Sequence, residues 1–413
     1  MNKIIFDEND FKKKYTVFLV CFLIAFFSLR GWFVLNLNIP TSFIYPVSAV
    51  MMTLLSIYSF YNIHIFKDSN LLSLKKIFLF NIFFGVYFIF SEVFMGSISI
   101  SLIYVFLAPY LFFLFIRIPI PSSHLTIFII ATGICFSILH NYYNVLSGSG
   151  YDYIRQYNMI LRPDLGEYNI SRSGDFIRVG GYTGSYHDSA HILGMLTTFF
   201  YTYFLINRVR KYLLFSILTL VCLLMTLSAA NILIAIFCCI LTTIYILYKQ
   251  RSFAIYMFIL IFVISIYLIF PLFPILTGFL DRVGSQGDYE GMTNALSVDM
   301  LSSIHFWFGH GYIFESELLI TEVALIKGIH QFGLIVALII YTLLLYPIWF
   351  YVRNPNALFK NLPYLIPILF AFMSLLHYGS LFKVTNIGIF YLFYALFFKT
   401  SLARLNKKII LRS

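Results

Sequence analysis

Long apolar runs are the feature that most constrains this chain. A helix needs about 20 predominantly apolar residues to cross the hydrocarbon core of a bilayer, which is roughly 30 Å thick. Runs of this kind predict an all-α, polytopic integral membrane protein, with about twelve transmembrane helices in a single domain over residues 1–413. They lie near residues 15–35, 41–62, 77–96, 98–116, 124–146, 189–207, 212–229, 231–248, 253–276, 329–352, 362–378 and 384–400.

Composition agrees with a membrane protein. Hydrophobic residues make up 61% of the chain and charged residues 11%, whereas a soluble domain carries about 25% charged residues. A soluble enzyme, a secreted disulfide scaffold and a disordered chain are therefore excluded. The net charge of +11 does not indicate a nucleic-acid partner, because the basic residues flank the apolar runs instead of lining one face. The five cysteines all lie inside apolar runs, so we expect them to be packing residues and not metal ligands.

The distribution of positive charge predicts the orientation. Cytoplasmic loops of membrane proteins carry an excess of Lys and Arg. That excess falls on alternate loops of the twelve-helix arrangement when both termini lie in the cytoplasm. The alternation depends on a very short break at Ser228–Asn231, between the runs 212–229 and 231–248.

Two long segments interrupt the pattern of short loops, at 147–189 and 277–329. Both are expected on the outer face. Loops longer than about 15 residues are usually functional or disordered. These two contain aromatic residues, glycines and charges of both signs, so we expect them to be folded extracytoplasmic loops. The chain has no internal repeat of the kind common in transporters.

The first long loop ends in a candidate anion site. Arg172 and Arg178 precede a glycine-rich stretch at 180–184, and an apolar helix follows, for which Asp188 or Ser189 is a plausible N-cap. A helix N-terminus offers free N–H groups, and the planar guanidinium of Arg suits phosphate. The alternative is a re-entry loop whose arginines pair with neighbouring carboxylates.

The second long loop contains a candidate base. Gly309-His310-Gly311 places a histidine on a turn, with Glu315 and Glu317 close behind it. Histidine suits general acid–base chemistry near neutral pH, and Glu315 could orient it or act as the base itself. The alternative is that His310 only forms hydrogen bonds within the loop.

Ionisable side chains beside spans are costly and tend to be functional. His330 stands at the start of the run 329–352, and His377 and Lys383 bracket the last outer turn. A single histidine of this kind is also a common packing residue. The chain has no P-loop, no nucleophile elbow and no His-Glu-x-x-His zinc pair, so we expect a substrate that arrives already activated in the membrane.

Three features together resemble a known family. They are many spans with two long outer loops, the element Arg178-Val-Gly-Gly-Tyr-Thr-Gly-Ser before a helix, and the turn Gly309-His-Gly311 followed by Gly328-Ile-His-Gln-Phe-Gly333. This arrangement is similar to that of the bacterial Wzy-type O-antigen and capsule polysaccharide polymerases, which share a superfamily with the O-antigen ligases. The resemblance covers most of the chain, and its motifs are short.

The resemblance implies a metal-independent, inverting glycosyltransferase of the GT-C type, with no cofactor. Such polymerases transfer a growing glycan from undecaprenyl pyrophosphate onto a new lipid-linked repeat unit at the outer face of the bacterial inner membrane. Membrane lipid and a chain-length regulator protein are the other candidate partners. The implied roles are pyrophosphate binding for Arg178 and Arg172, catalysis for His310, Glu315 or His187, and substrate contact for Tyr182, His191, His330 and His377.

One departure from the family concerns the short turn between spans seven and eight. Many relatives carry Thr-x-Ser-Arg there, and this chain has Thr226-Leu-Ser228-Ala-Ala-Asn231. We expect Arg282 or Lys383 to replace the missing arginine. The alternatives left open are an O-antigen ligase, a flippase or transporter for the same lipid-linked glycan, and a non-enzymatic membrane subunit.

Overall fold

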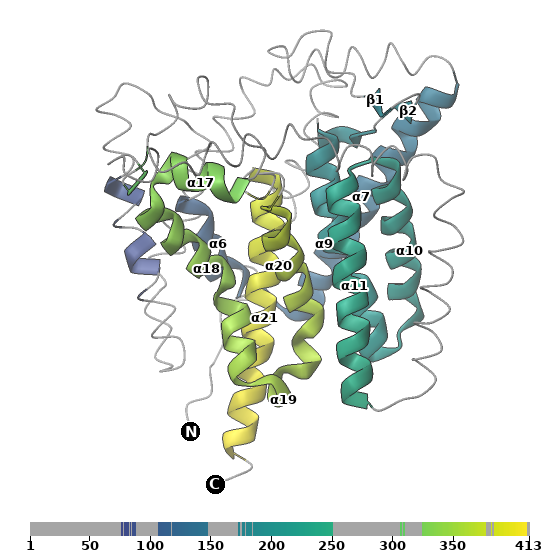
Figure 1. Cartoon of the computed structure of the whole chain (residues 1–413). Coiled ribbons are helices and arrows are strands. Elements are labelled where there is room, and N and C mark those ends of the chain that lie inside the picture. Colours follow the sequence, from purple (N-terminus) through teal and green to yellow (C-terminus); the bar gives the residue numbers. More distant parts are fainter. Residues whose placement is uncertain are drawn as a thin grey trace, which may run out of the picture.

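The computed structural model consists of long helices that run alternately up and down (Figure 1). It describes residues 76, 78–81, 83, 85–87, 106–116, 118–147, 172–173, 176–177, 179–183, 185–250, 306–307, 309, 324–376, 381 and 384–410. The elements are η3 (Ala108–Tyr110), α6 (Leu111–Phe115), α7 (Ile120–Leu146), β1 (Arg172–Ser173), β2 (Phe176–Ile177), η5 (Gly181–Thr183), α9 (Tyr186–Asn207), α10 (Arg210–Met225), α11 (Ala229–Gln250), α17 (Ala324–Phe332), α18 (Leu334–Arg353), α19 (Pro355–Leu358), η8 (Phe359–Asn361), α20 (Leu362–Ser374) and α21 (Val384–Ile410).

Six helical segments in the described residues are long and apolar enough to cross a membrane. This finding confirms the prediction of a multi-pass, all-α membrane protein, to which the described part adds only the two-residue strands β1 and β2. The predicted runs 15–35, 41–62 and 253–276 lie outside the described residues, so the count of twelve stays a prediction. The six segments are Ile120–Tyr143, Tyr186–Asn207, Ala229–Lys249, Leu334–Arg353, Pro355–Ser374 and Asn386–Leu405.

Two short connections decide where the spans begin. The predicted break near Ser228 is confirmed, because α10 ends at Met225 and α11 begins at Ala229. The predicted start of a span at 329 is wrong. Residues 324–332 form the separate helix α17, and α18 begins after Gly333, whose φ of 78° is readily adopted only by glycine.

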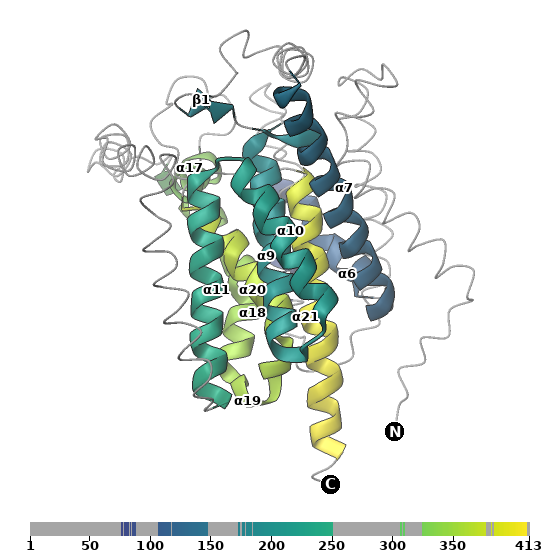
Figure 2. The same ribbon diagram turned by 90° about the vertical axis from the view of Figure 1, so that its right-hand side faces the viewer.

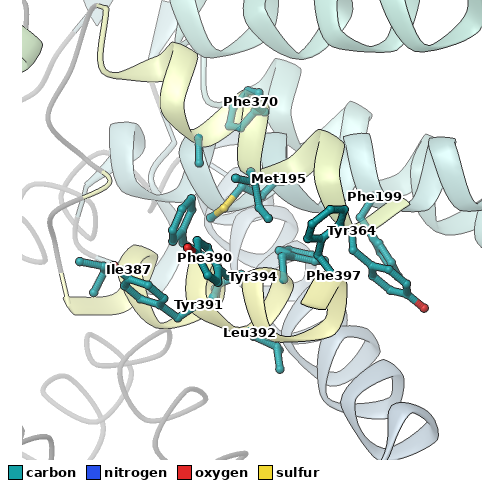
Figure 3. Packing of buried hydrophobic residues seen from close by; sticks show 14 of the residues in the cluster. Met195, Phe199, Tyr364, Phe370, Ile387, Phe390, Tyr391, Leu392, Tyr394 and Phe397 are labelled. Carbon is teal, nitrogen blue, oxygen red and sulfur yellow. The ribbon is translucent and has the colours of Figure 1, made fainter. Parts of the chain in front are cut away.

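Helix α9 lies in the middle of the described bundle and packs against α7, α10, α11, α20 and α21 (Figure 2). The core between α9, α20 and α21 is largely aromatic. Figure 3 shows Met195 and Phe199 of α9 among rings from the other two helices. Large rings bury much apolar surface and limit how neighbouring helices can shift. The fully buried rings here include Phe199, Phe200, Phe370, Phe390, Tyr391, Phe393, Tyr394 and Phe397.

Gly194 marks a close contact between α9 and α20. A Cβ at this position would collide with the end of the Phe370 ring, and Phe370 has no exposed surface. Gly388 of α21 is the opposite case, because a Cβ there meets no atom within 4 Å. The two positions therefore form a matched pair of helical glycines.

We expect Gly194→Ala to destabilise the protein by about 1–3 kcal/mol, because overpacking displaces the Phe370 ring. Gly388→Ala should be neutral or stabilising by up to about 1 kcal/mol, since alanine is the better helix former. Thermal unfolding of the two purified variants in one detergent measures the difference. Equal midpoints would show that α9 and α20 do not cross closely at Gly194.

The lower end of the bundle in Figure 1, with the C-terminus, carries basic helix ends. Lys249 at the end of α11 donates to the side chain of Asn356, at 2.8 Å, and the Arg353 guanidinium lies 3.7 Å above the Trp349 ring. Arg208 and Arg210 are exposed at the α9–α10 turn. The predicted orientation depends on basic residues of this kind, because cytoplasmic loops carry an excess of Lys and Arg.

His124 ties three helices together near the same end. Its Nδ1 lies 2.7 Å from the Tyr212 hydroxyl of α10, and its Nε2 lies 2.8 Å from the Tyr364 hydroxyl of α20. Both ring nitrogens are therefore engaged, which fits a structural role for this histidine.

Candidate functional site at one end of the bundle

The upper end of the bundle in Figure 1 gathers the sequence elements that were singled out for function. The strands β1 and β2 lie there, together with the start of α9, the α10–α11 turn, the end of α20 and the short helix α17. These elements come from distant parts of the chain, and the up-and-down course of the helices returns them to one end.

The segment that follows Arg178 has a fixed backbone. Val179 is buried, and Gly181 has a φ of 58° and lies against Ser137 and Ile138 of α7 so closely that a side chain would strike Ser137. The Thr183 hydroxyl lies 2.6 Å from the Ser189 hydroxyl and 2.9 Å from the Ser185 carbonyl. The glycine-rich stretch is thus fastened to α7 and α9.

The predicted N-cap of α9 is wrong. The helix begins at Tyr186, and Ser185 occupies the cap position with extended backbone and no side-chain capping bond. Asp188 and Ser189 lie inside the first turn instead. Ser189 is not the cap because its own N–H already donates to the Ser185 carbonyl within the helix, at 3.1 Å, and its hydroxyl donates to the Gly180 carbonyl. Asp188 is buried, and a carboxylate in a first turn is favoured by the helix dipole. The first long loop therefore ends at 185 rather than 189.

His187 brings the first turn of α9 to the α10–α11 turn. Its Nδ1 lies 3.5 Å from the Ser228 hydroxyl, and the Asn231 amide donates to the same hydroxyl at 3.0 Å. Ser228 and Asn231 are buried, and His187 is half-buried. Two helices, α9 and α11, begin at this point, and helix N-termini present N–H groups that favour anions.

His191 lies one turn further along α9 and is completely buried. Its Nδ1 lies 2.8 Å from the Ser374 hydroxyl of α20, and its Nε2 has no hydrogen-bond partner among the described residues. The sequence predicted direct substrate contact for His191. In this structure the side chain instead joins α9 to the end of α20.

The two glycine elements of the late spans lie against each other. Gly309 has a φ of 86°, and a Cβ there would lie 2.7 Å from the Gln331 carbonyl oxygen and 2.8 Å from the Gly333 nitrogen. The helix α17 is also joined to the end of α20, because the Leu325 N–H donates to the Leu375 carbonyl at 3.0 Å. Gly309 is thus placed beside the start of α18.

The predicted site residues divide into those that the structure describes and those that it does not. His187 and His191 are described in full. Arg172 in β1, Tyr182 in η5 and His330 in α17 are placed by their backbones only. The predictions for Arg178, Arg282, His310, Glu315, His377 and Lys383 lie outside the described residues, although Arg178 directly precedes Val179 and His310 directly follows Gly309.

Several polar residues of this end were not predicted as functional. The sequence marked Ser228 and Asn231 as a short break between two spans and as the place where an arginine is missing. Ser374 had no signal beyond being a polar residue at the end of an apolar helix, and nothing in the sequence pairs it with His191. Among the described residues no group of three or more His, Cys, Asp or Glu side chains could hold a metal ion.

The fold and this end of the bundle define the class of protein. It is a multi-pass membrane protein with a polar site at one end of its helix bundle. Histidines, hydroxyls, an amide and two helix N-termini are suited to holding a polar, anionic group at the membrane surface. No model of a known protein family matches the chain, and no curated protein matches its sequence.

Proposed function

We propose that this protein is a polysaccharide polymerase of the outer face of the bacterial inner membrane, with about twelve spans of GT-C type and both termini in the cytoplasm. It joins oligosaccharide repeat units that are carried on undecaprenyl pyrophosphate. The single observation that carries the proposal is the contact between His187 and Ser228, at 3.5 Å.

This contact matters because it joins an element that carries the resemblance to the turn at which the chain departs from the family. One is the stretch from Arg178 to the first turn of α9, and the other is the turn from Thr226 to Asn231. They are distant in sequence, and each is a candidate element on its own sequence features. Their meeting at one end of the bundle supports a shared site, and His187 contacts the turn on which many relatives of the family carry an arginine.

The proposed reaction needs a base for the acceptor hydroxyl and a group that stabilises the leaving pyrophosphate. The hydroxyl of the acceptor sugar attacks the anomeric carbon of the donor glycan, the bond from that carbon to the pyrophosphate oxygen breaks, and a base takes the hydroxyl proton. Arg178, with donors from the α9 and α11 N-termini, stabilises the charge that develops on the leaving pyrophosphate. His310, Glu315 or His187 is the candidate base. The polyprenyl chain lies along the apolar surface of the bundle.

A glycan ladder from a deletion strain tests the proposal, resolved on a gel together with the lipid-linked pool. Loss of the ladder, with single repeat units still transferred to lipid A core, is the expected result. Loss of all transferred glycan, with long polymer left on the lipid carrier, would identify a ligase instead. Repeat units that accumulate on the cytoplasmic face would identify a flippase.

We also expect the activity to be independent of divalent metal. Arginines and helix N-termini provide the positive charge that a metal ion would otherwise supply to the leaving group. Polymer formation in membrane vesicles treated with EDTA should stay within about twofold of the untreated rate. A loss of activity that added Mg²⁺ restores would contradict this mechanism.

A further inference from the structure

We propose that His191 and Ser374 form a positioning pair, which holds the first turn of α9 in register with the end of α20. This inference rests on the proposed function and adds two residues to its machinery. Neither residue needs to touch substrate, because His191 is completely buried and Ser374 is 2% exposed.

The hydrogen bonds determine the tautomer of His191. The Ser374 hydroxyl lies 2.7 Å from the Ala371 carbonyl, which can only accept, and 2.8 Å from His191 Nδ1. Both contacts are hydrogen bonds only if Ser374 donates to Ala371 and accepts from His191. His191 then carries its proton on Nδ1 and presents a bare Nε2.

The bare Nε2 argues against a purely stabilising role. In the part of the chain that the structure describes it is buried without a partner, and a buried polar atom without a hydrogen bond lowers stability. An apolar side chain at this position would avoid that cost. What the histidine supplies in return is a directional bond to α20, which specifies one arrangement of two helices.

The pair lies between the two halves of the proposed site. On one side, His191 stands one turn after His187, on the same face of α9, so a fixed His191 fixes the approach to Ser228. On the other side, Ser374 precedes Leu375, whose carbonyl accepts from Leu325 of α17. The helix α17 ends at the backbone that Gly309 touches. The chain of contacts therefore runs from the Arg178 element to the turn that carries His310.

The chain offers a matched control pair at the other end of α20. There Asn361 donates to the Ser401 hydroxyl of α21 at 2.8 Å. Both residues are completely buried, and Asn361 also has an unpartnered oxygen. Ser374→Ala and Ser401→Ala thus remove equivalent interhelical hydrogen bonds, one beside the proposed site and one remote from it.

The test measures initial rates of polymer formation by the full-length protein in proteoliposomes, with the lipid-linked repeat unit extracted from the deletion strain as substrate. Ser374→Ala should lower kcat about tenfold or more and change KM by less than about twofold, because misplaced catalytic groups slow the reaction without weakening binding. Ser401→Ala should change kcat by less than about twofold. Thermal unfolding midpoints identify variants that fail to fold.

Two substitutions of His191 distinguish the roles of its two ring nitrogens. Asparagine can offer an N–H near the position of Nδ1, and glutamine can offer one near the position of Nε2. We expect His191→Asn to stay within about threefold of the wild-type kcat and His191→Gln to lose about tenfold. The comparison of His191→Asn with His191→Gln also tests the inference if Ser374→Ala does not fold.

The outcomes distinguish the inference from the proposed function. An active wild type in which Ser374→Ala behaves like Ser401→Ala would overturn the inference alone. So would an active His191→Gln beside an inactive His191→Asn, because Nε2 would then act directly on substrate. A wild-type protein that makes no polymer would overturn the proposed function.

Discussion

Replacing Arg178 by alanine is expected to abolish polymer formation while the protein still inserts and folds. The leaving group of the proposed reaction is a pyrophosphate, and removal of one group that stabilises developing charge typically costs about 100-fold or more in rate. Arg178 directly precedes Val179, which is buried, and the backbone from Gly180 to Gly181 is fastened to α7 and α9. A side chain attached beside a fixed backbone can hold its charge in one place.

Chain-length ladders and initial rates of Arg178→Ala measure this effect. Arg178→Lys should keep part of the activity, because lysine keeps the charge but loses the bidentate fork. Arg210→Ala is the matched control, since Arg210 is exposed at the opposite end of the bundle, and it should make chains of wild-type length. Wild-type chains from Arg178→Ala at equal expression would remove Arg178 from the pyrophosphate site.

The spans could be predicted because their signal is local. An apolar run of about 20 residues needs no partner to be recognised, and even the short break near Ser228 was visible as a polar interruption. The boundary at Gly333 was missed because the strongly apolar run from Leu334 onward masks the polar residues His330 and Gln331 before it. The break depends on the positive φ of Gly333, which composition does not reveal.

The side-chain pairs of the site could not be predicted in the same way. His191 and Ser374 are separated by 183 positions, and only the packing of α9 against α20 brings them together. The N-cap of α9 was misplaced for a related reason. Ser189 has the right chemistry for a cap, but the helix already begins at Tyr186, and that start depends on how the loop before it folds against α7 and α9.

Gly309→Ala is expected to lower the rate of polymer formation about 10- to 100-fold, because a displacement of about 1 Å in a catalytic group can cost that much. An alanine at the observed φ of 86° is strained by roughly 1–2 kcal/mol. Its Cβ would also lie 2.7 Å from the Gln331 carbonyl oxygen. Backbone atoms cannot move aside as a flexible side chain can, so the turn itself must shift, and His310 is the next residue.

Gly388→Ala provides the control for Gly309→Ala, since the chemical change is the same and the new methyl group meets no atom within 4 Å. The two variants should differ strongly in rate and by only about 1–3 kcal/mol in stability, because Gly309 lies outside the aromatic core between α9, α20 and α21. A comparable loss of rate in both would point to a general effect of added volume. Full activity of Gly309→Ala would show that the turn can move without consequence, and the base would then have to be sought at His187 rather than at His310.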